Sequence, residues 1–501
     1  MSRRRAKTTI RYARGGKAHL IISPEPPRDA RLIYLILIYC VLQVALGLWL
    51  GRKVRTSSDF FVAGRSLSPG LLFATLVAAN VGAGSTVGAA GLGYSNGIAA
   101  WWWVGSAGVG SLLMAFTVGP RIWKIAKDHN LKTVGDFLEW RFSRDVRGVI
   151  ASLLWVGTIS ILSGQLIALA WVLNVVAGLD KTTGVIIGGV VATVYFSAGG
   201  LLSSVWINFL QLGVMIVGFF AAIPLALSKT GGFAGLQAAT SDPAGFWNFF
   251  SNGSSGIHYL ALLAPAFIIS PGLLQKVYGA RDQAAVRKGV AWNAVALFIF
   301  AFVPPTIGLI ARALHPALST PELAMPTIFM QDLPAWFGAL GLAAVVSAEI
   351  STADAVLFML STSLSQDLYK GFVNRAATDP QVLRVARGAA IGGGILGILV
   401  ALKASTVIGA LGIFYSLLSV SLFVPVVLGL YVEATDRRHA YAAIVLGIGT
   451  LLAVQLWTGG KGYGMLTPPL LGLLAAAAGG AVALLVLPRS LSTRPVSRNQ
   501  V

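Results

Sequence analysis

The chain has 501 residues, of which 56% are hydrophobic and only 11% are charged, and its formal net charge is +20. In a soluble protein this charge would favour nucleic acid as a partner, but apolar runs long enough to cross a bilayer are spread along the whole chain. The composition therefore indicates a polytopic membrane protein surrounded by lipid bilayer, and we expect no nucleic-acid binding.

Thirteen apolar runs of about 17 residues or more predict membrane-spanning helices. They cover residues 33–50, 70–93, 98–119, 148–177, 182–198, 203–226, 255–275, 289–314, 335–365, 386–402, 407–432, 439–457 and 467–487. Helices are expected because every backbone amide in hydrocarbon needs an internal partner, and the runs are too long and too uniformly apolar for barrel strands.

The runs divide the chain into successive parts. These are a basic tail at 1–30, a first transmembrane helix at 31–51, two five-helix halves at 70–226 and 255–432, two further helices at 436–488 and a tail at 489–501. Two such halves are the arrangement expected of transporters built from inverted repeats. We expect no soluble output domain in either short tail.

Lysine and arginine residues are distributed unevenly between the loops. After the first span, alternate loops and the C-terminal tail carry twenty-four of them, and the opposite loops carry five. Because basic loops stay on the cytoplasmic side, this bias predicts a multi-pass cell-membrane protein with a cytoplasmic C-terminus and an external N-terminus. The nine basic residues before the first span conflict with that placement, so either the tail is an upstream extension or the first span is misplaced.

Two spans contain interruptions at matching places. Asn80 is followed by the glycine-rich stretch 82–86 in the first helix of one half, and Pro265 and Ser270-Pro271-Gly272 interrupt the first helix of the other. Small residues usually serve close helix packing, and a lone proline usually only kinks a helix. An asparagine beside several glycines instead favours an unwound segment, which is typical of the midplane sites of transporters.

Glu349 and Asp354 lie in the middle of the long apolar run at 335–365. Burying an ionisable side chain in a membrane is costly, so such residues are candidates for function by default.

Several motifs occur in an order that is similar to one family. They are Asp59–Arg65, Gly199-Gly200-Leu201 with Val205-Trp206 and Gln211, Gln275-Lys276, Ile350–Asp354, Asp367–Lys370 and Pro425–Tyr431. Together with the interrupted helix they resemble the sodium:solute symporters, which include glucose, proline and pantothenate carriers. The resemblance covers about residues 33–440. It implies an all-α membrane carrier with about thirteen helices, a LeuT-like five-plus-five inverted-repeat core, alternating access and sodium as the coupling ion.

The resemblance further implies a sodium ion held between the first and eighth helices of the core. Its ligands would be the backbone carbonyls of Ala78, Val81 and Ala348 and the hydroxyls of Ser351 and Thr352. Oxygen ligands suit a hard cation, and positions 348, 351 and 352 share one helix face by their spacing. Alternatively, the two hydroxyls bond back to their own helix, as membrane serines and threonines often do.

Three polar positions of the core extend this comparison. Several family members have an aspartate tied to a second sodium ion where this chain has Asn208, and a neutral amide there predicts one coupling ion per substrate. Asp354 matches a common family choice and is expected to orient the sodium ligands. Glu349 is not associated with its position in the family, and it is either a structural hydrogen-bond donor between helices or a proton-coupling site.

The substrate is expected to be a small acid rather than a sugar. The segment Gly82–Ser85 has no large polar side chain where sugar carriers have Glu and Gln, whereas backbone amides at a half-helix N-terminus suit a carboxylate. This favours a monocarboxylate or an amino acid. The candidate contacts are Asn80, Ser85, Thr86, Gln211, Phe267 and Ser270, and Tyr415 lies where the family places gating residues, although a tyrosine inside a helix is more often packing.

The sequence thus predicts secondary active import of a small organic solute with sodium. The alternative within this class is proton coupling through Glu349 or Asp354, and the alternative from another class is a solute sensor or membrane scaffold without net transport. An enzyme is not expected, because the five histidines lie outside the spans or near their ends and no His-x-x-Glu-His or Gly-x-Ser-x-Gly pattern occurs. The oligomeric state does not follow from the sequence.

Overall fold

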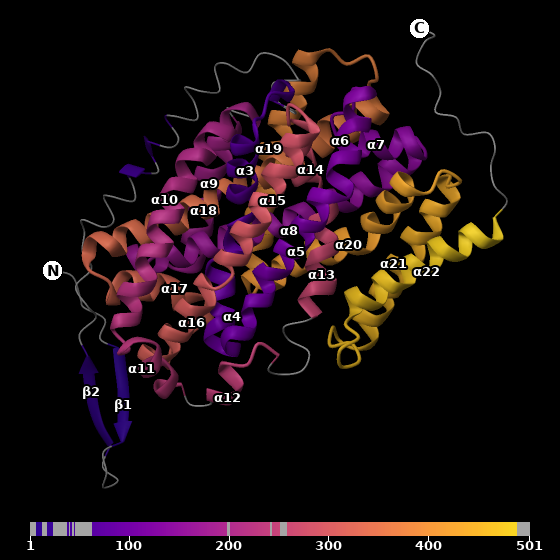
Figure 1. The fold of residues 1–501 in the computed structure, drawn as a ribbon. Helices are drawn as coiled ribbons and strands as arrows, with labels where there is room; N and C mark the ends of the chain where they lie inside the picture. Colours follow the sequence, from indigo (N-terminus) through magenta and orange to yellow (C-terminus); the bar gives the residue numbers. More distant parts are fainter. Residues whose placement is uncertain are drawn as a thin grey trace.

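The structure is a computed structural model that describes residues 7–12, 18–23, 38–39, 41–42, 45, 63–197, 201–240, 243–250 and 258–487. From residue 63 onward the described chain is a bundle of helices joined by short loops (Figure 1). The exception to the predicted all-α fold is an antiparallel hairpin of β1 (Lys7–Tyr12) and β2 (Ala18–Ser23) in the basic tail. The hydrophobic runs gave no signal for this hairpin.

The helices follow the two predicted halves. The first contains η1 (Ala63–Arg65), α3 (Pro69–Asn80), η2 (Ala83–Ser85), α4 (Val87–Asn96), η3 (Gly97–Ala100), α5 (Trp101–Phe116), α6 (Val118–Asp128), α7 (Val134–Arg141), α8 (Arg144–Ala177), α9 (Lys181–Ser197) and α10 (Leu201–Ser228). After α11 (Gly232–Ala239) and α12 (Pro243–Phe246), the second contains α13 (His258–Ile269), α14 (Pro271–Tyr278), α15 (Gln283–Phe300), α16 (Val303–Leu314), η4 (Pro321–Leu323), α17 (Ala324–Thr327), η5 (Ile328–Asp332), α18 (Ala335–Thr362), η6 (Ser363–Val373), α19 (Asp379–Lys403) and α20 (Val407–Tyr431). The last two helices are α21 (Arg437–Trp457) and α22 (Pro468–Val486).

Within the described residues, ten helical stretches are long and apolar enough to cross a membrane, and Pro69–Asn80 and Lys181–Val194 are shorter apolar helices. Most of the predicted first transmembrane helix at 31–51 lies outside the described residues, so the count of thirteen stays a prediction. The predicted spans 70–93 and 98–119 meet without a loop, because η3 leads directly from α4 into α5.

Both predicted interruptions are breaks between two helices. In the first, α3 ends at Asn80, Val81 is extended, and α4 begins at Val87. In the second, α13 ends at Ile269 and α14 begins at Pro271, which occupies the first helical turn. A proline there is favourable because its missing N–H would have no helical acceptor anyway.

The broken helix α3/α4 lies inside the bundle. α3 packs against α10, α14, α15 and α18, and α8 packs against α18 and α20. By contrast, α21 and α22 lie together at one edge of the bundle, drawn in yellow in Figure 1. The core helices therefore surround the first break with protein.

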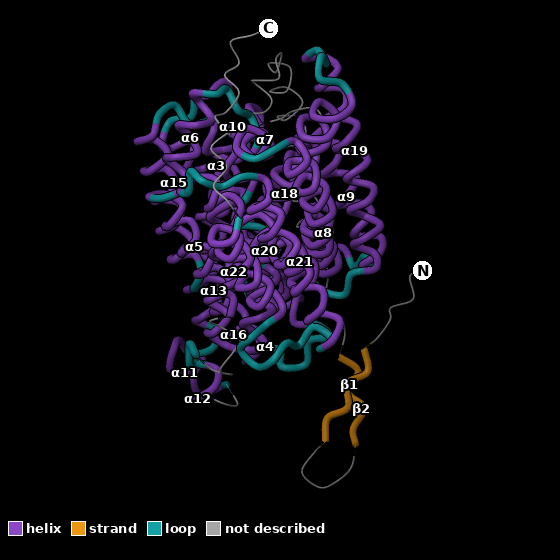
Figure 2. The backbone as a smooth tube through the Cα atoms, turned by 90° about the vertical axis from the view of Figure 1, so that its right-hand side faces the viewer, coloured by secondary structure: helices purple, strands orange, loops and turns teal. Residues whose placement is uncertain are grey.

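One end of the bundle gathers the loops that were counted as basic. α6, α7, the C-terminal end of α14 and η6 meet there, and α11 and α12 lie at the opposite end (Figures 1 and 2). We call the first of these the basic end. At this end, Arg147 donates to Glu139 Oε2 at 2.7 Å and to Asp367 Oδ1 at 2.9 Å, and Arg65 donates to the carbonyl of Tyr278 at 3.0 Å. These contacts tie α7, α8, η6 and the chain before α3 to one another.

Candidate functional site

The first break is formed where the backbone of α3 passes very close to α18. A Cβ atom added at Gly82 would collide with the side chain of Thr352 and with Gln165 Oε1. Only glycine fits, so the sequence allows the close approach at this position. Gln165 on α8 accepts a hydrogen bond of 2.8 Å from the Ala83 amide, which fixes the unwound segment from the other side.

The end of α3 leaves carbonyl oxygens without helical partners. The Gly82 amide would bond to Ala78 O in a continuous helix, but it donates to Ser85 Oγ at 2.9 Å instead. Val81 is already extended and its carbonyl points out of the helical pattern. Carbonyls freed in this way are the usual cation ligands of broken membrane helices.

The structure brings all five predicted sodium ligands together. Ser351 Oγ lies 2.7 Å from Ala78 O and 3.0 Å from Ala348 O. Thr352 Oγ1 lies 3.3 Å from Ala78 O and 3.2 Å from Val81 O. Ser351 thus contacts both its own helix and α3, whereas every hydrogen bond found for Thr352 crosses to α3, so simple back-bonding does not account for Thr352.

The donor set fits a monovalent cation. It consists of neutral oxygens from carbonyls and hydroxyls, and Ser351 and Thr352 are buried, at 0% and 5% exposure. Among the described residues no group of three or more His, Cys, Asp or Glu side chains forms a metal site. Neutral oxygen ligands suit a hard cation that carries a single charge, and the assignment of the five residues to sodium remains a prediction.

The two acids of α18 face different neighbours. Glu349 Oε1 lies 2.7 Å from Thr86 Oγ1 at the start of α4, and Glu349 Oε2 is buried without a hydrogen-bond partner among the described residues. Asp354 is buried and interacts electrostatically with Lys276 of α14. Neither acid is among the atoms that converge at the five predicted ligands.

A cavity lies beside the break, between both broken helices and α18. It offers about 60 Å³ to the centres of water-sized molecules, whereas a single water needs roughly 10–15 Å³ on this measure. Its lining contains Asn80, Ser85, Phe267, Ser270 and Tyr415 among the predicted contact and gating residues, together with Gly82 and the ligand Thr352. The ion ligands and the cavity therefore share a wall.

Two predicted substrate contacts lie elsewhere. Thr86 is absent from the cavity lining and bonds to Glu349 and to Gly82 O. Gln211 is buried in α10, also away from the lining. Both residues are near the interrupted segment or conspicuous in sequence, but their side chains point toward neighbouring helices because of how those helices are rotated.

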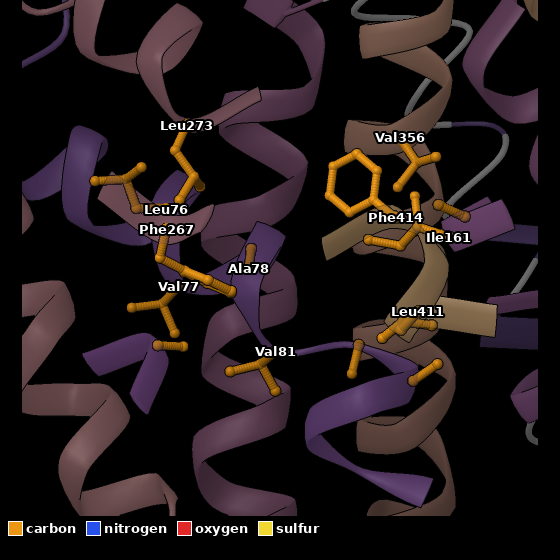
Figure 3. Close-up of a cluster of buried hydrophobic side chains, with 14 of the residues drawn as sticks. Leu76, Val77, Ala78, Val81, Ile161, Phe267, Leu273, Val356, Leu411 and Phe414 are labelled. Atoms are coloured by element: carbon orange, nitrogen blue, oxygen red, sulfur yellow. The ribbon is translucent and has the colours of Figure 1, made fainter. Parts of the chain in front are cut away.

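Sequence reasoning missed several lining residues. Gln165 of α8, Trp103 of α5 and Phe414 of α20 all contribute to the cavity. Figure 3 shows Phe267 and Leu273 on one side of this region and Phe414 and Val356 on the other. A glutamine inside an apolar span was a usable signal for Gln165, but the aromatic residues had none, since most aromatics in spans only pack.

Aromatic rings close around Tyr415. Its ring lies 6.1 Å from that of Trp103 and 5.6 Å from that of Phe267. This contact is compatible with both expectations for Tyr415, packing and gating, so the gating role stays a prediction.

Two helix N-termini face the cavity. Gly84 and Ser85 precede α4, and Ser270 and Gly272 lie at the start of α14. The unpaired amides at helix N-termini and the helix dipole favour a negative group. None of the lining side chains is acidic or basic, so backbone polarity rather than a side-chain charge would orient a bound solute.

Comparison with known proteins decides the family. Residues 60–447 match the model of the sodium:solute symporter family. The chain belongs to the sodium:solute symporter family. Among the relatives of this symporter, the sodium/glucose cotransporter of Vibrio parahaemolyticus is 24% identical over 465 residues, which cover 83% of each chain. The sodium/pantothenate symporter of Escherichia coli (strain K12) is 27% identical over 448 residues, covering 83% of this chain and 88% of the relative.

The fold matches that of a Na⁺-coupled sialic acid symporter solved in a substrate-bound, outward-open state. The TM-score is 0.78 at 17% identity, over 92% of this chain and 98% of the other. The predicted fold class, a helical membrane carrier with a LeuT-like core, is confirmed. Family membership makes the chain a sodium-coupled, multi-pass membrane symporter and not an enzyme. The named solutes of these three proteins differ, so the family does not fix the solute.

Proposed function

We propose that this symporter imports a small organic solute, a monocarboxylate or an amino acid, together with one sodium ion per cycle. The observation that carries the proposal is the convergence of five oxygens from α3 and α18 on the wall of the cavity. An ion bound between these helices would hold the end of α3 against α18. Because a ligand shifts a conformational equilibrium only through its different affinity for the two states, sodium would favour the state in which these helices touch.

The solute class follows from the polarity of the cavity. Two helix N-termini face it and its side chains are neutral, which suits a carboxylate better than an ammonium group. The sodium ion at Thr352 would add positive charge to the same wall. Trp103, Phe267 and Tyr415 offer apolar surface to the rest of a small solute.

Uptake into proteoliposomes tests the proposal. The purified protein is reconstituted and offered labelled monocarboxylates, amino acids and sugars under separate sodium and proton gradients. We expect sodium-driven uptake of an acid or amino acid. Uptake that follows the proton gradient and ignores sodium would refute sodium coupling and favour the alternative through Glu349, and binding without uptake would favour a solute sensor.

The double variant Ser351→Ala/Thr352→Ala tests the ion ligands. It removes two oxygens, and each interaction with a charged group is worth about 1.5–3 kcal/mol, so we expect the sodium concentration for half-maximal uptake to rise by about 100-fold or more. The matched control is Ser361→Ala/Thr362→Ala in the same helix, where both hydroxyls bond back to carbonyls one turn earlier. Unchanged sodium affinity in the first variant would contradict the assignment.

A further inference from the structure

Lys276 is a lysine wholly enclosed by protein inside the core. It lies on α14, its exposure is 2%, and its ammonium nitrogen is 3.2 Å from Thr75 Oγ1 of α3. An isolated buried ammonium is very costly, so a buried lysine needs both hydrogen-bond acceptors and a negative partner. The transport reaction described above makes no use of this charge.

The surroundings of Lys276 meet both needs. Asp354 of α18, itself 3% exposed, attracts the ammonium. Asn208 of α10 is fully buried and its Nδ2 lies 3.3 Å from the same Thr75 oxygen. Thr75, Asn208, Lys276 and Asp354 thus form one cluster contributed by four helices, which we call the Lys276 cluster.

The Lys276 cluster also contains an unused acceptor. Asn208 Oδ1 is buried and has no hydrogen-bond partner among the described residues. A carboxylate, a hydroxyl and an amide oxygen are a suitable donor set for a hard cation. The four helices that contribute them, α3, α10, α14 and α18, pack directly on one another.

The cluster lies next to the predicted sodium ligands. Thr75 precedes Ala78 by three residues and Asp354 follows Thr352 by two, on the same pair of helices. A mobile ion entering the cluster would meet the fixed ammonium of Lys276 at once. Since like charges at such separations repel strongly in a poorly hydrated interior, only one of the two cations fits.

We propose that the Lys276 ammonium is a tethered cation that fills a second cation site in the Lys276 cluster, so that this symporter needs only one mobile sodium ion. The proposal rests on the sodium symport proposed above and gives a reason for its one-ion stoichiometry. A tethered charge neutralises Asp354 in every state of the cycle without being drawn from solution. Removing it leaves a carboxylate, a hydroxyl and an amide oxygen open to a second sodium ion.

Equilibrium binding of ²²Na⁺ to the purified full-length protein tests the proposal without using transport. We expect one ion per chain for the wild type and two for Lys276→Gln, which keeps much of the side-chain length and removes the charge. Lys276→Arg retains a cation and should bind one ion. The double variant Lys276→Gln/Asp354→Asn, which has neither charge, should also return to one.

Uptake provides a second readout. In Lys276→Gln the Hill coefficient for sodium should rise from about 1 to about 2, while the control Lys288→Gln, on the exposed surface of α15 at the basic end, should behave as the wild type. A Lys276→Gln protein that binds the same number of sodium ions as the wild type would overturn the proposal.

Folding and the proposed function are separated by the same set of variants. If Lys276→Gln cannot be purified in folded form, the proposal requires that Lys276→Gln/Asp354→Asn can, because the charges are again balanced, and loss of both would overturn it. If the wild type binds no sodium, the proposed symport fails, but a gain of one ion in Lys276→Gln would still support the tethered cation.

Discussion

At the scale of single residues, Glu349 is defined by one contact that sequence could not reveal. Its Oε1 lies 2.7 Å from Thr86 Oγ1, and the same hydroxyl lies 2.9 Å from Gly82 O. Thr86 has one proton and can donate to only one of these acceptors. A protonated Glu349 that donates to Thr86 lets Thr86 donate to Gly82 O, which satisfies the whole chain of groups. This arrangement favours the structural hypothesis for Glu349 over proton coupling.

The contact makes a prediction about Glu349. An amide at this position can still donate to Thr86, so Glu349→Gln should retain sodium-driven uptake with a sodium affinity within about threefold of wild type. Glu349→Leu leaves the buried hydroxyl without this partner at a cost of about 1–3 kcal/mol, and we expect uptake to fall at least tenfold. Rates would be measured in proteoliposomes from pH 6 to 8. Loss of uptake in the glutamine variant over this whole range would instead indicate that Glu349 carries a transported proton.

At the scale of elements, the break between α3 and α4 depends on glycine at one position. Asn80 and the glycines after it were enough to predict an unwound segment, because polar and flexible residues interrupt a helix locally. The structure adds that Gly82 faces Thr352 and Gln165 so closely that no β-carbon fits. The distance between α3 and α18, and with it the geometry of the ion ligands, is therefore controlled from the break.

Gly82→Ala tests this control. The added methyl forces α3 and α18 apart, which typically costs about 1–3 kcal/mol in a packed interior, and we expect the affinity for ²²Na⁺ to fall by about tenfold or more. The control is Gly70→Ala near the start of α3, where an added Cβ has no heavy atom within 4 Å. Equal sodium binding by both variants would show that the ligands do not depend on the close approach.

At the scale of the whole molecule, the charge distribution of the sequence corresponds to a physical end of the bundle. The loops counted as basic gather around α6, α7, α14 and η6, and α11 and α12 lie at the other end (Figure 1). Basic loops are retained in the cytoplasm during membrane insertion. We therefore infer that the basic end is cytoplasmic, and that the C-terminus lies on that side.

Thiol labelling checks this orientation. With Cys40→Ser as background, Arg281→Cys places a thiol at an exposed position of the basic end, where the native side chain is 58% exposed. Lys461→Cys places one in the exposed loop between α21 and α22 at the opposite end. In right-side-out vesicles, a membrane-impermeant maleimide should label position 461 at once and position 281 only after lysis. The reverse pattern would place the basic end outside.

The sequence by itself determined the membrane class, the positions of most spans and of both breaks, and a resemblance that carried the five ion ligands. These features are local or nearly so: the length of an apolar run, a proline or glycine within it, and a spacing of three and four residues on one helix. The family resemblance supplied the pairing of α3 with α18, which no local pattern contains.

Only the tertiary structure decided which polar side chains meet. It turned Thr86 toward Glu349 and away from the cavity, brought Gln165, Trp103 and Phe414 into the lining, and placed Lys276 beside Thr75 and within the field of Asp354. The physical reason is that each of these contacts joins helices far apart in the chain. Their rotation and depth are set by the packing of the whole bundle, which hydrophobic periodicity within one helix does not specify.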